Sequence, residues 1–223
     1  MPNTLTGTEA AAAIYAQVRA RAARLTEPPC LAAVSVGAQP DDRSYLRSIA
    51  QAADGCGVTV RPVPLPADCA PETLTDTLRT LSADGGVHGV LLLRPLPAAL
   101  RAQEILDALD ARKDVDGMTP VSAAGVFTGS GEGFPPCTAQ ACMALLDYYH
   151  IDCAGKSAAV IGRSAVVGRP AAMLLLARNA TVTVCHTGTV DLPAVTRTAD
   201  IIVTAAGAAG SLTAAHVRPG QTV

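Results

Sequence analysis

The sequence predicts a two-domain α/β protein in which each domain holds a parallel sheet covered by helices on both faces. Nearly continuous apolar strands alternate with helical patterns. This alternation occurs twice, before and after an irregular stretch rich in Gly, Pro and Ser/Thr at residues 112–138. A chain of 223 residues can form two small domains with sizeable cores. We therefore expect an N-terminal α/β domain at 1–137 and a Rossmann-like domain at 138–223.

The first half is expected to alternate helices and buried strands. The helix at 71–83 is the clearest, because Leu74, Leu78 and Leu81 fall on one face. The strand at 58–65 is weakened by two prolines near its end. The other elements follow from periodicity and from Gly57, which ends a helix; they are helices at 8–25 and 43–56 and strands at 30–37 and 87–94.

The second half repeats this pattern. Its first helix is expected at 138–150, with Thr138 as N-cap. The expected elements after it are strands at 157–162, 181–185 and 200–207 and helices at 167–178 and 191–197. This series is the βαβ arrangement of a nucleotide-binding unit.

Composition excludes several classes of protein. The 17 basic and 19 acidic residues give a net charge of −2, without a basic cluster, so no nucleic-acid partner is expected. No signal peptide and no stretch of about 20 apolar residues is found, which predicts a cytoplasmic protein without a membrane partner. The seven cysteines form no C-x-x-C pair and no zinc spacing, so reduced thiols and no metal are expected.

A candidate phosphate-binding loop joins a strand to an apolar helix in the second half. The strand "SAAVIG" runs into "GRSAVVGRP", Gly162 to Pro170. Gly162 suits a tight turn, Gly168 allows the helix to pack closely, and the N–H groups at the helix start are available to phosphate. The Gly-x5-Gly spacing is weaker than G-x-G-x-x-G. An ordinary strand–helix turn therefore remains the alternative.

Two features favour NADP over NAD. An NAD site places an acidic residue at the tip of the next strand, where it binds the ribose. Here that tip is "CHTGT", Cys185 to Thr189, which contains no acid. Arg163 lies in the glycine loop, where it can meet a 2′-phosphate, and His186 is a candidate neighbour of the cofactor phosphate.

Seven stretches together resemble the methylenetetrahydrofolate dehydrogenase/cyclohydrolase (FolD) family. The order and spacing hold from about residue 5 onward, and the stretches are "VGAQPDDRSYLRS", "LLLRPLP", "KDVDGMTP", "FPPCTAQA", "VIGRSAVVGRP", "VTVCHTGT" and "IIVTAAGAAG". The resemblance implies an N-terminal folate-binding catalytic domain, an NADP-binding domain that forms a homodimer, and a folate site between the two domains.

The resemblance also implies site residues. Tyr45 and Asp116 are the expected catalytic residues: Tyr45 stacks along the folate and Asp116 accepts hydrogen bonds from the pterin-like ring. Leu93 and Pro95 complete the expected substrate site. The expected NADP contacts are Gly162, Arg163, Ser164, Val167, Gly168, His186, Thr187 and Gly207.

The sequence departs from the family at the residues that move protons. The family's lysine, four residues after the tyrosine, is Ile49 here, and the family's glutamine is Leu93, followed by Arg94. Neither aliphatic side chain carries a proton, so the cyclohydrolase step is expected to be lost or weak. Hydride transfer mainly requires alignment of the two rings, so an NADP-dependent oxidation of 5,10-methylenetetrahydrofolate remains expected.

Two other readings stay open at this point. The family chain continues beyond the position of Val223 with a further strand, a glycine-rich loop and a helix, so this chain resembles a C-terminally shortened member. With Ile49 and Leu93, that difference is also compatible with an inert FolD-like binding paralogue. The same losses, with Arg94, are compatible with an enzyme retuned for a specialised biosynthetic pathway.

Overall fold

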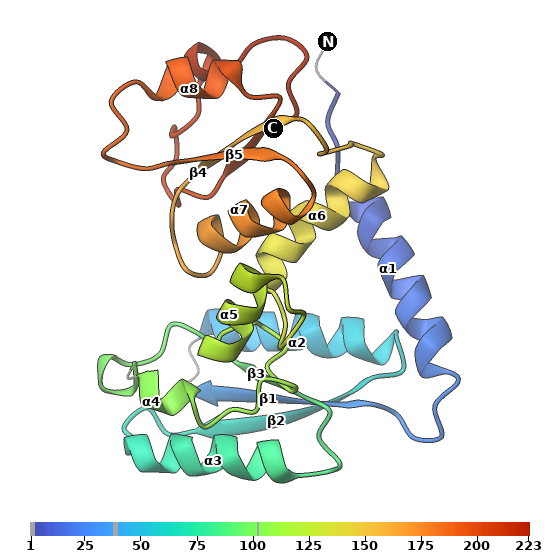
Figure 1. Ribbon diagram of the computed structural model, residues 1–223. Helices are drawn as coiled ribbons and strands as arrows, with labels where there is room; N and C mark the ends of the chain where they lie inside the picture. Colours follow the sequence, from blue (N-terminus) through green and yellow to red (C-terminus); the bar gives the residue numbers. More distant parts are fainter. Residues whose placement is uncertain (1–2, 38–39, 102) are drawn as a thin grey trace. The chain divides into compact units, whose positions relative to one another are not determined.

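A computed structural model describes residues 3–37, 40–101 and 103–223 (Figure 1). The chain divides into two compact units. The N-terminal unit contains residues 6–122 and 132–134, and the C-terminal unit contains residues 123–131, 135–223 and the short segment before Thr6. The division passes through a helix, and the expected domain boundary after residue 137 stays a prediction.

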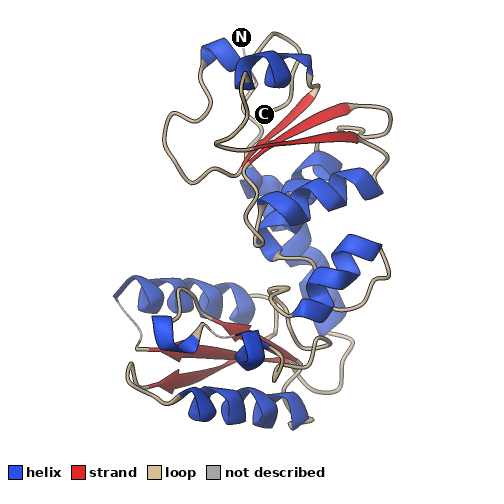
Figure 2. Cartoon of the chain, turned by 60° about the vertical axis from the view of Figure 1, so that its left-hand side comes forward, coloured by secondary structure: helices blue, strands red, loops and turns tan. Residues whose placement is uncertain are grey.

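The N-terminal unit is built on a parallel three-stranded sheet of order β2-β1-β3. Helices α2 and α3 lie on opposite faces of this sheet, as Figures 1 and 2 show. The strands are β1 (Cys30–Val36), β2 (Thr59–Leu65) and β3 (Gly89–Leu92), and the main helices are α1 (Gly7–Ala22), α2 (Pro40–Asp54) and α3 (Pro71–Ala83). The expected covered parallel sheet is confirmed.

The two prolines of β2 explain its place at the edge of the sheet. The amide of Thr59 donates to Pro29 and the amide of Gly37 donates to Leu65, so odd-numbered residues of β2 bond toward β1. Pro62 and Pro64 therefore occupy positions whose nitrogen faces away from β1. A residue without an N–H group costs no ladder hydrogen bond there and discourages pairing with a further strand.

The core of the N-terminal unit follows from the apolar spacing. Leu74 and Leu78 of α3 are fully buried, as is Val34 of the central strand. They pack in one cluster with Val90 and Leu92 of β3. The helix predicted at 71–83 is confirmed with both bounds, because a leucine at every third or fourth position faces the sheet.

The C-terminal unit holds the second parallel sheet, of order β5-β4-β6. Helices α6 and α7 cover one face and α8 covers the other (Figures 1 and 2). The strands are β4 (Ser157–Ile161), β5 (Thr181–Cys185) and β6 (Ile201–Thr204), and the helices are α6 (Cys137–Tyr148), α7 (Gly168–Ala177) and α8 (Leu192–Thr198). Thr222 bridges Ile201 in parallel beside β6.

Two expectations for the middle of the chain are wrong. Residues 112–138 are not wholly irregular, because α5 (Pro120–Thr128) lies within them. Thr138 is not an N-cap, since α6 begins one residue earlier and its N-cap is Pro136. The short η1 (Ala98–Leu100) and α4 (Gln103–Leu106) also lack a sequence prediction, and η2 (Ala214–His216) lies near the end.

None of the seven cysteines, all within the described segments, forms a disulfide, as expected. No helix in the described part of the chain combines the length and the apolar character that crossing a membrane requires.

Candidate active site

The segment that follows α4 brings Asp116 to the carboxyl end of β3. Val90 of β3 forms a parallel bridge with Asp114, and its amide donates to the carbonyl of Lys113 at 2.7 Å. Beyond Asp114 the chain turns, with the amide of Gly117 donating to the carbonyl of Asp114 at 3.1 Å, and Asp116 lies in this turn. The turn places Asp116 next to Arg94, which follows β3.

A buried aspartate, Asp114, fixes the loop that carries Asp116. Asp114 is 1% exposed, and its carboxylate accepts hydrogen bonds from the Met118 amide at 3.0 Å, the Thr119 amide at 2.7 Å and the Ser122 hydroxyl at 2.7 Å. A buried carboxylate is stable only when it is bonded in this way. Asp114 is not among the site residues predicted from the sequence. Its two-residue spacing from Asp116 was the available signal.

Asp116 faces Arg94 across 3.9 Å, measured from Oδ2 to Nη2. The Arg94 side chain is 34% exposed and that of Asp116 is 26% exposed, so both groups remain accessible. Neither side chain makes a hydrogen bond to another residue in the described parts of the chain. The carboxylate therefore keeps its capacity to accept donors from a ligand.

The remaining predicted substrate residues lie on two elements. Tyr45 and Ile49 are one helical turn apart on α2, on one face, with Tyr45 58% exposed and Ile49 half-buried. Leu93 is buried and its amide donates to Val34, whereas Pro95 is exposed. The approach of Tyr45 and Ile49 to Asp116 stays a prediction.

Lys113 does not replace the missing lysine. Its Nζ donates to the carbonyls of Leu81 at 3.2 Å and Asp84 at 2.7 Å. These carbonyls lie at the end of α3, where a cation also interacts favourably with the helix dipole. Lys113 therefore stabilises the C-terminus of a helix.

In the C-terminal unit, two glycines allow β4 to turn sharply into α7. Gly162 has φ +121°, and a Cβ atom there would overlap the backbone carbonyl of Ala205. A Cβ atom at Gly168 would overlap the carbonyl of Gly162. Both positions require glycine because the backbones touch, as the close packing of strand and helix in a dinucleotide-binding turn demands.

The expectation that the first amides of α7 are available to phosphate is wrong. Ser164 Oγ accepts from the amides of Val167 at 3.1 Å and Gly168 at 3.4 Å, and its carbonyl accepts from Arg169 at 3.0 Å. The amides of residues 163–166 instead donate to no other residue that the structure describes. The loop itself, with exposed Arg163, therefore offers the donors for an anion.

The turn after β5 is held by its own side chains. Thr189 Oγ1 accepts from the His186 amide at 2.9 Å, and His186 Nδ1 accepts from the Gly188 amide at 3.0 Å. A neutral His186 therefore carries its proton on Nε2. Thr187 is exposed. Burial raises the pKa of the neighbouring Cys185 thiol, which keeps it protonated and unreactive at neutral pH.

These loops meet where the strand order reverses. The chain passes from β4 to β5 on one side and then crosses to β6 on the other. The loop after β6 begins beside Gly162, since the Ala205 amide donates to Ile161 at 2.7 Å, and it contains exposed Gly207. Ligands of open α/β sheets bind outside the carboxyl ends of the strands at such a switch point.

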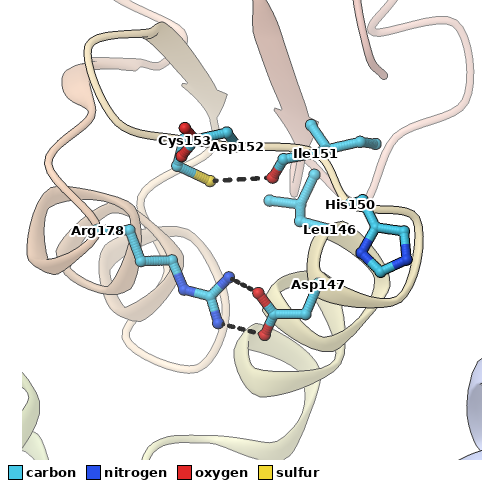
Figure 3. A pocket seen from close by; sticks show the side chains of 7 residues that line it. All are labelled: Leu146, Asp147, His150, Ile151, Asp152, Cys153 and Arg178. Carbon is cyan, nitrogen blue, oxygen red and sulfur yellow. Dashed lines mark hydrogen bonds and ion pairs between the residues drawn. The ribbon is translucent and has the colours of Figure 1, made fainter.

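A separate pocket of about 390 Å³ lies near the amino ends of β4 and β5, opposite the carboxyl ends that carry these loops (Figure 3). It is lined by the end of α6, by residues 150–153, which precede β4, and by Arg178, which precedes β5. Arg178 donates to both oxygens of Asp147, at 2.6 and 2.7 Å, and so ties α7 to α6. In the described parts of the chain no cluster of His, Cys, Asp and Glu suitable for a metal is found.

The fold and these loops define a two-unit α/β protein whose C-terminal unit has the form of a nucleotide-binding domain. The family model of the tetrahydrofolate dehydrogenase/cyclohydrolase catalytic domain matches residues 5–116, and that of the NAD(P)-binding domain of the same family matches residues 136–223. The chain belongs to the tetrahydrofolate dehydrogenase/cyclohydrolase family.

Individual relatives agree with this assignment. The chain is 43% identical to the bifunctional protein FolD of Nocardia farcinica over 223 residues, 99% of this chain and 78% of that protein. The FolD crystal structure from Campylobacter jejuni has a TM-score of 0.92 and 37% identity, covering 96% of this chain and 77% of that one. The Trypanosoma brucei enzyme, complexed with NADP and an inhibitor, has a TM-score of 0.85 and 31% identity, covering 93% and 73%.

Proposed function

We propose that this protein is an oxidoreductase that converts 5,10-methylenetetrahydrofolate to 5,10-methenyltetrahydrofolate with NADP, and that its cyclohydrolase step is lost or weak. The observation that carries the proposal is the intact loop at residues 162–168, with Arg163 exposed, in a chain of this family. The folate-binding domain is proposed to span 1–137 and the NADP-binding domain 138–223.

Asp116 is the proposed anchor of the pteridine ring. A carboxylate accepts two adjacent N–H donors side by side, as a 2-amino-4-oxo pyrimidine edge presents them. The hydrogen bonds to Asp114 support this role because they hold the loop in one conformation. Tyr45, with an exposed ring, is proposed to stack on the folate, and Leu93 and Pro95 to border it.

The loops of the C-terminal unit are proposed to hold NADP. The amides of residues 163–166 and the side chain of Ser164 supply donors for the pyrophosphate, and Arg163 pairs with the 2′-phosphate. Val167, Gly168 and Gly207 shape the turns, and His186 and Thr187 border the cofactor. Asp191, which follows this turn in the sequence, caps α8 by accepting from the Ala194 amide, and "CHTGT" itself contains no acid. NADP is therefore preferred to NAD.

The proposed chemistry needs no group that transfers a proton. A hydride leaves the methylene carbon for the nicotinamide, and the cationic methenyl product and NADPH result. NADP supplies the hydride acceptor, and the protein aligns the two rings. Hydrolysis of the methenyl bridge requires an activated water, and neither Ile49 nor Leu93 can bind one. The methenyl compound is therefore the expected final product.

The test is NADP⁺-dependent oxidation of 5,10-methylenetetrahydrofolate by the purified chain, compared with Asp116→Ala and with NAD⁺. We expect formation of NADPH that depends on Asp116, and formation of NADH from NAD⁺ that is at least about tenfold slower. NADP binding without turnover would instead identify a binding paralogue. We propose that the protein forms a homodimer through the nucleotide-binding unit, and light scattering tests this.

A further inference from the structure

Arg94 and Asp116 stand side by side at the end of β3 without completing a hydrogen bond. Their 3.9 Å separation exceeds the roughly 2.7–2.9 Å of a charge-assisted hydrogen bond. A partly exposed ion pair at this distance contributes little to stability. Both groups thus offer unfilled hydrogen-bonding capacity on one side of the loop, one as an acceptor and the other as a donor.

We propose that Arg94 is a specificity-determining residue that recognises the carbonyl oxygen at position 4 of the pteridine, next to the donors that Asp116 binds. This inference rests on the proposed function. The 2-amino-4-oxo edge presents a donor, a second donor and an acceptor in a row. A carboxylate beside a guanidinium presents two acceptors and then donors, which is the complementary order.

The same arrangement disfavours a 4-amino pteridine. A neutral 2,4-diamino ring presents an acceptor at position 3, opposite the carboxylate, and a donor at position 4, opposite Arg94. Neither hydrogen bond can form. Two acceptors then face each other at position 3 and two donors face each other at position 4, in a partly desolvated site. A site that is built to bond a ligand group rejects an analogue that lacks it, because its own polar groups remain unpaired.

The guanidinium is suited to this role in a way that an ammonium is not. Arginine directs several N–H groups from one planar fork, so one N–H can face Asp116 while another reaches a ligand oxygen. Lysine at position 94 would keep the charge without the fork. Arg94→Lys is therefore expected to retain only part of the discrimination.

The test compares two ligands that differ only at position 4, folic acid and 4-aminofolic acid, by calorimetry at pH 8 with NADP present. Arg94→Leu is expected to weaken folic acid binding about tenfold and to change 4-aminofolic acid binding by less than about twofold. Arg79→Leu is the matched control, because it removes an exposed Arg–Asp pair of 3.1 Å from α3 in the same unit. It should change neither affinity.

Three outcomes decide against the proposal. An unchanged ratio of the two affinities in Arg94→Leu, with folic acid still bound, overturns the role of Arg94 alone. Tighter folic acid binding would show that Arg94 obstructs Asp116. If the unaltered protein binds NADP but neither pteridine, the folate site of the proposed function fails as well. If Arg94→Leu unfolds at a lower temperature than Arg79→Leu, Arg94→Lys takes its place in the test. An unchanged ratio of the folic acid and 4-aminofolic acid affinities in Arg94→Lys would then overturn the proposal.

Discussion

The two units place their candidate binding residues at the carboxyl ends of parallel strands, but they fix them by different means. In the C-terminal unit the loop between β4 and α7 is set by backbone contacts that only glycine permits. In the N-terminal unit the corresponding residues are side chains on α2 and after β3. Backbone contacts are part of the fold, whereas an exposed or half-buried side chain can change without unfolding the chain.

The family's proton-carrying positions illustrate this difference. Ile49 is half-buried and Leu93 is buried at 7% exposure, so both aliphatic side chains are compatible with the sheet and its helix. The chain keeps the glycine turn proposed to bind NADP, and aliphatic residues occupy the two positions where the family resemblance implies lysine and glutamine. The proposed function, hydride transfer without hydrolysis, is consistent with this difference between the two units.

The largest expected effect is on the loop that holds Asp116. Asp114→Ala leaves three donors without their acceptor, which should lower the free energy of unfolding by about 4 kcal/mol. Asp68, which is exposed in the same unit, is the control, and Asp68→Ala should change it by less than about 0.5 kcal/mol. Urea denaturation measures both. A loss below about 1 kcal/mol for Asp114→Ala would contradict the account.

Gly162→Ala tests the backbone side of the comparison. It combines a positive φ with overlap on Ala205, so a loss of about 3 kcal/mol and of NADP binding is expected. Gly155→Ala isolates the conformational strain, because Gly155 has φ +71° and nothing within 4 Å of an added Cβ; it should cost about 1 kcal/mol. Equal losses for the two variants would show that close packing of the turn is unimportant.

Restoring the proton-carrying residues tests the part of the comparison that concerns side chains in the N-terminal unit. Ile49→Lys combined with Leu93→Gln should raise hydrolysis of 5,10-methenyltetrahydrofolate at least about 100-fold, equivalent to about 2.7 kcal/mol of barrier. Loss of methenyl absorbance above the uncatalysed rate is the readout. The matched control is Ile49→Leu, which adds no polar group and should stay inactive. No gain in a folded double variant would mean that more than these residues has changed.

The smallest effect concerns the choice of cofactor. Arg163→Leu should weaken NADP⁺ binding about tenfold, equivalent to about 1.4 kcal/mol, and leave NAD⁺ binding unchanged. Arg169, also exposed at the start of α7, is the control arginine. If Arg163→Leu weakened the binding of NADP⁺ and of NAD⁺ equally, Arg163 would contact the pyrophosphate, which both cofactors share, and not the 2′-phosphate.

The sequence predicted the sheets and the strongly amphipathic helix α3 because their apolar spacing is regular. It missed α5, although Thr119 followed by Pro120 is a typical helix start, and Thr119 Oγ1 indeed accepts from the Ser122 amide at 3.1 Å. The apolar α5 lacks a polar face, so periodicity gave no signal. The Arg94–Asp116 contact depends on the pairing of residue 114 with β3, which no local pattern encodes.

One assay tests the central claim most directly: NADPH and methenyltetrahydrofolate are followed separately while the protein oxidises 5,10-methylenetetrahydrofolate with NADP⁺. Hydride transfer without hydrolysis predicts that one methenyl product accumulates for each NADPH formed. Methenyl product that falls short of NADPH, beyond its uncatalysed hydrolysis, would show that the protein still hydrolyses the bridge despite Ile49 and Leu93, and would contradict the account.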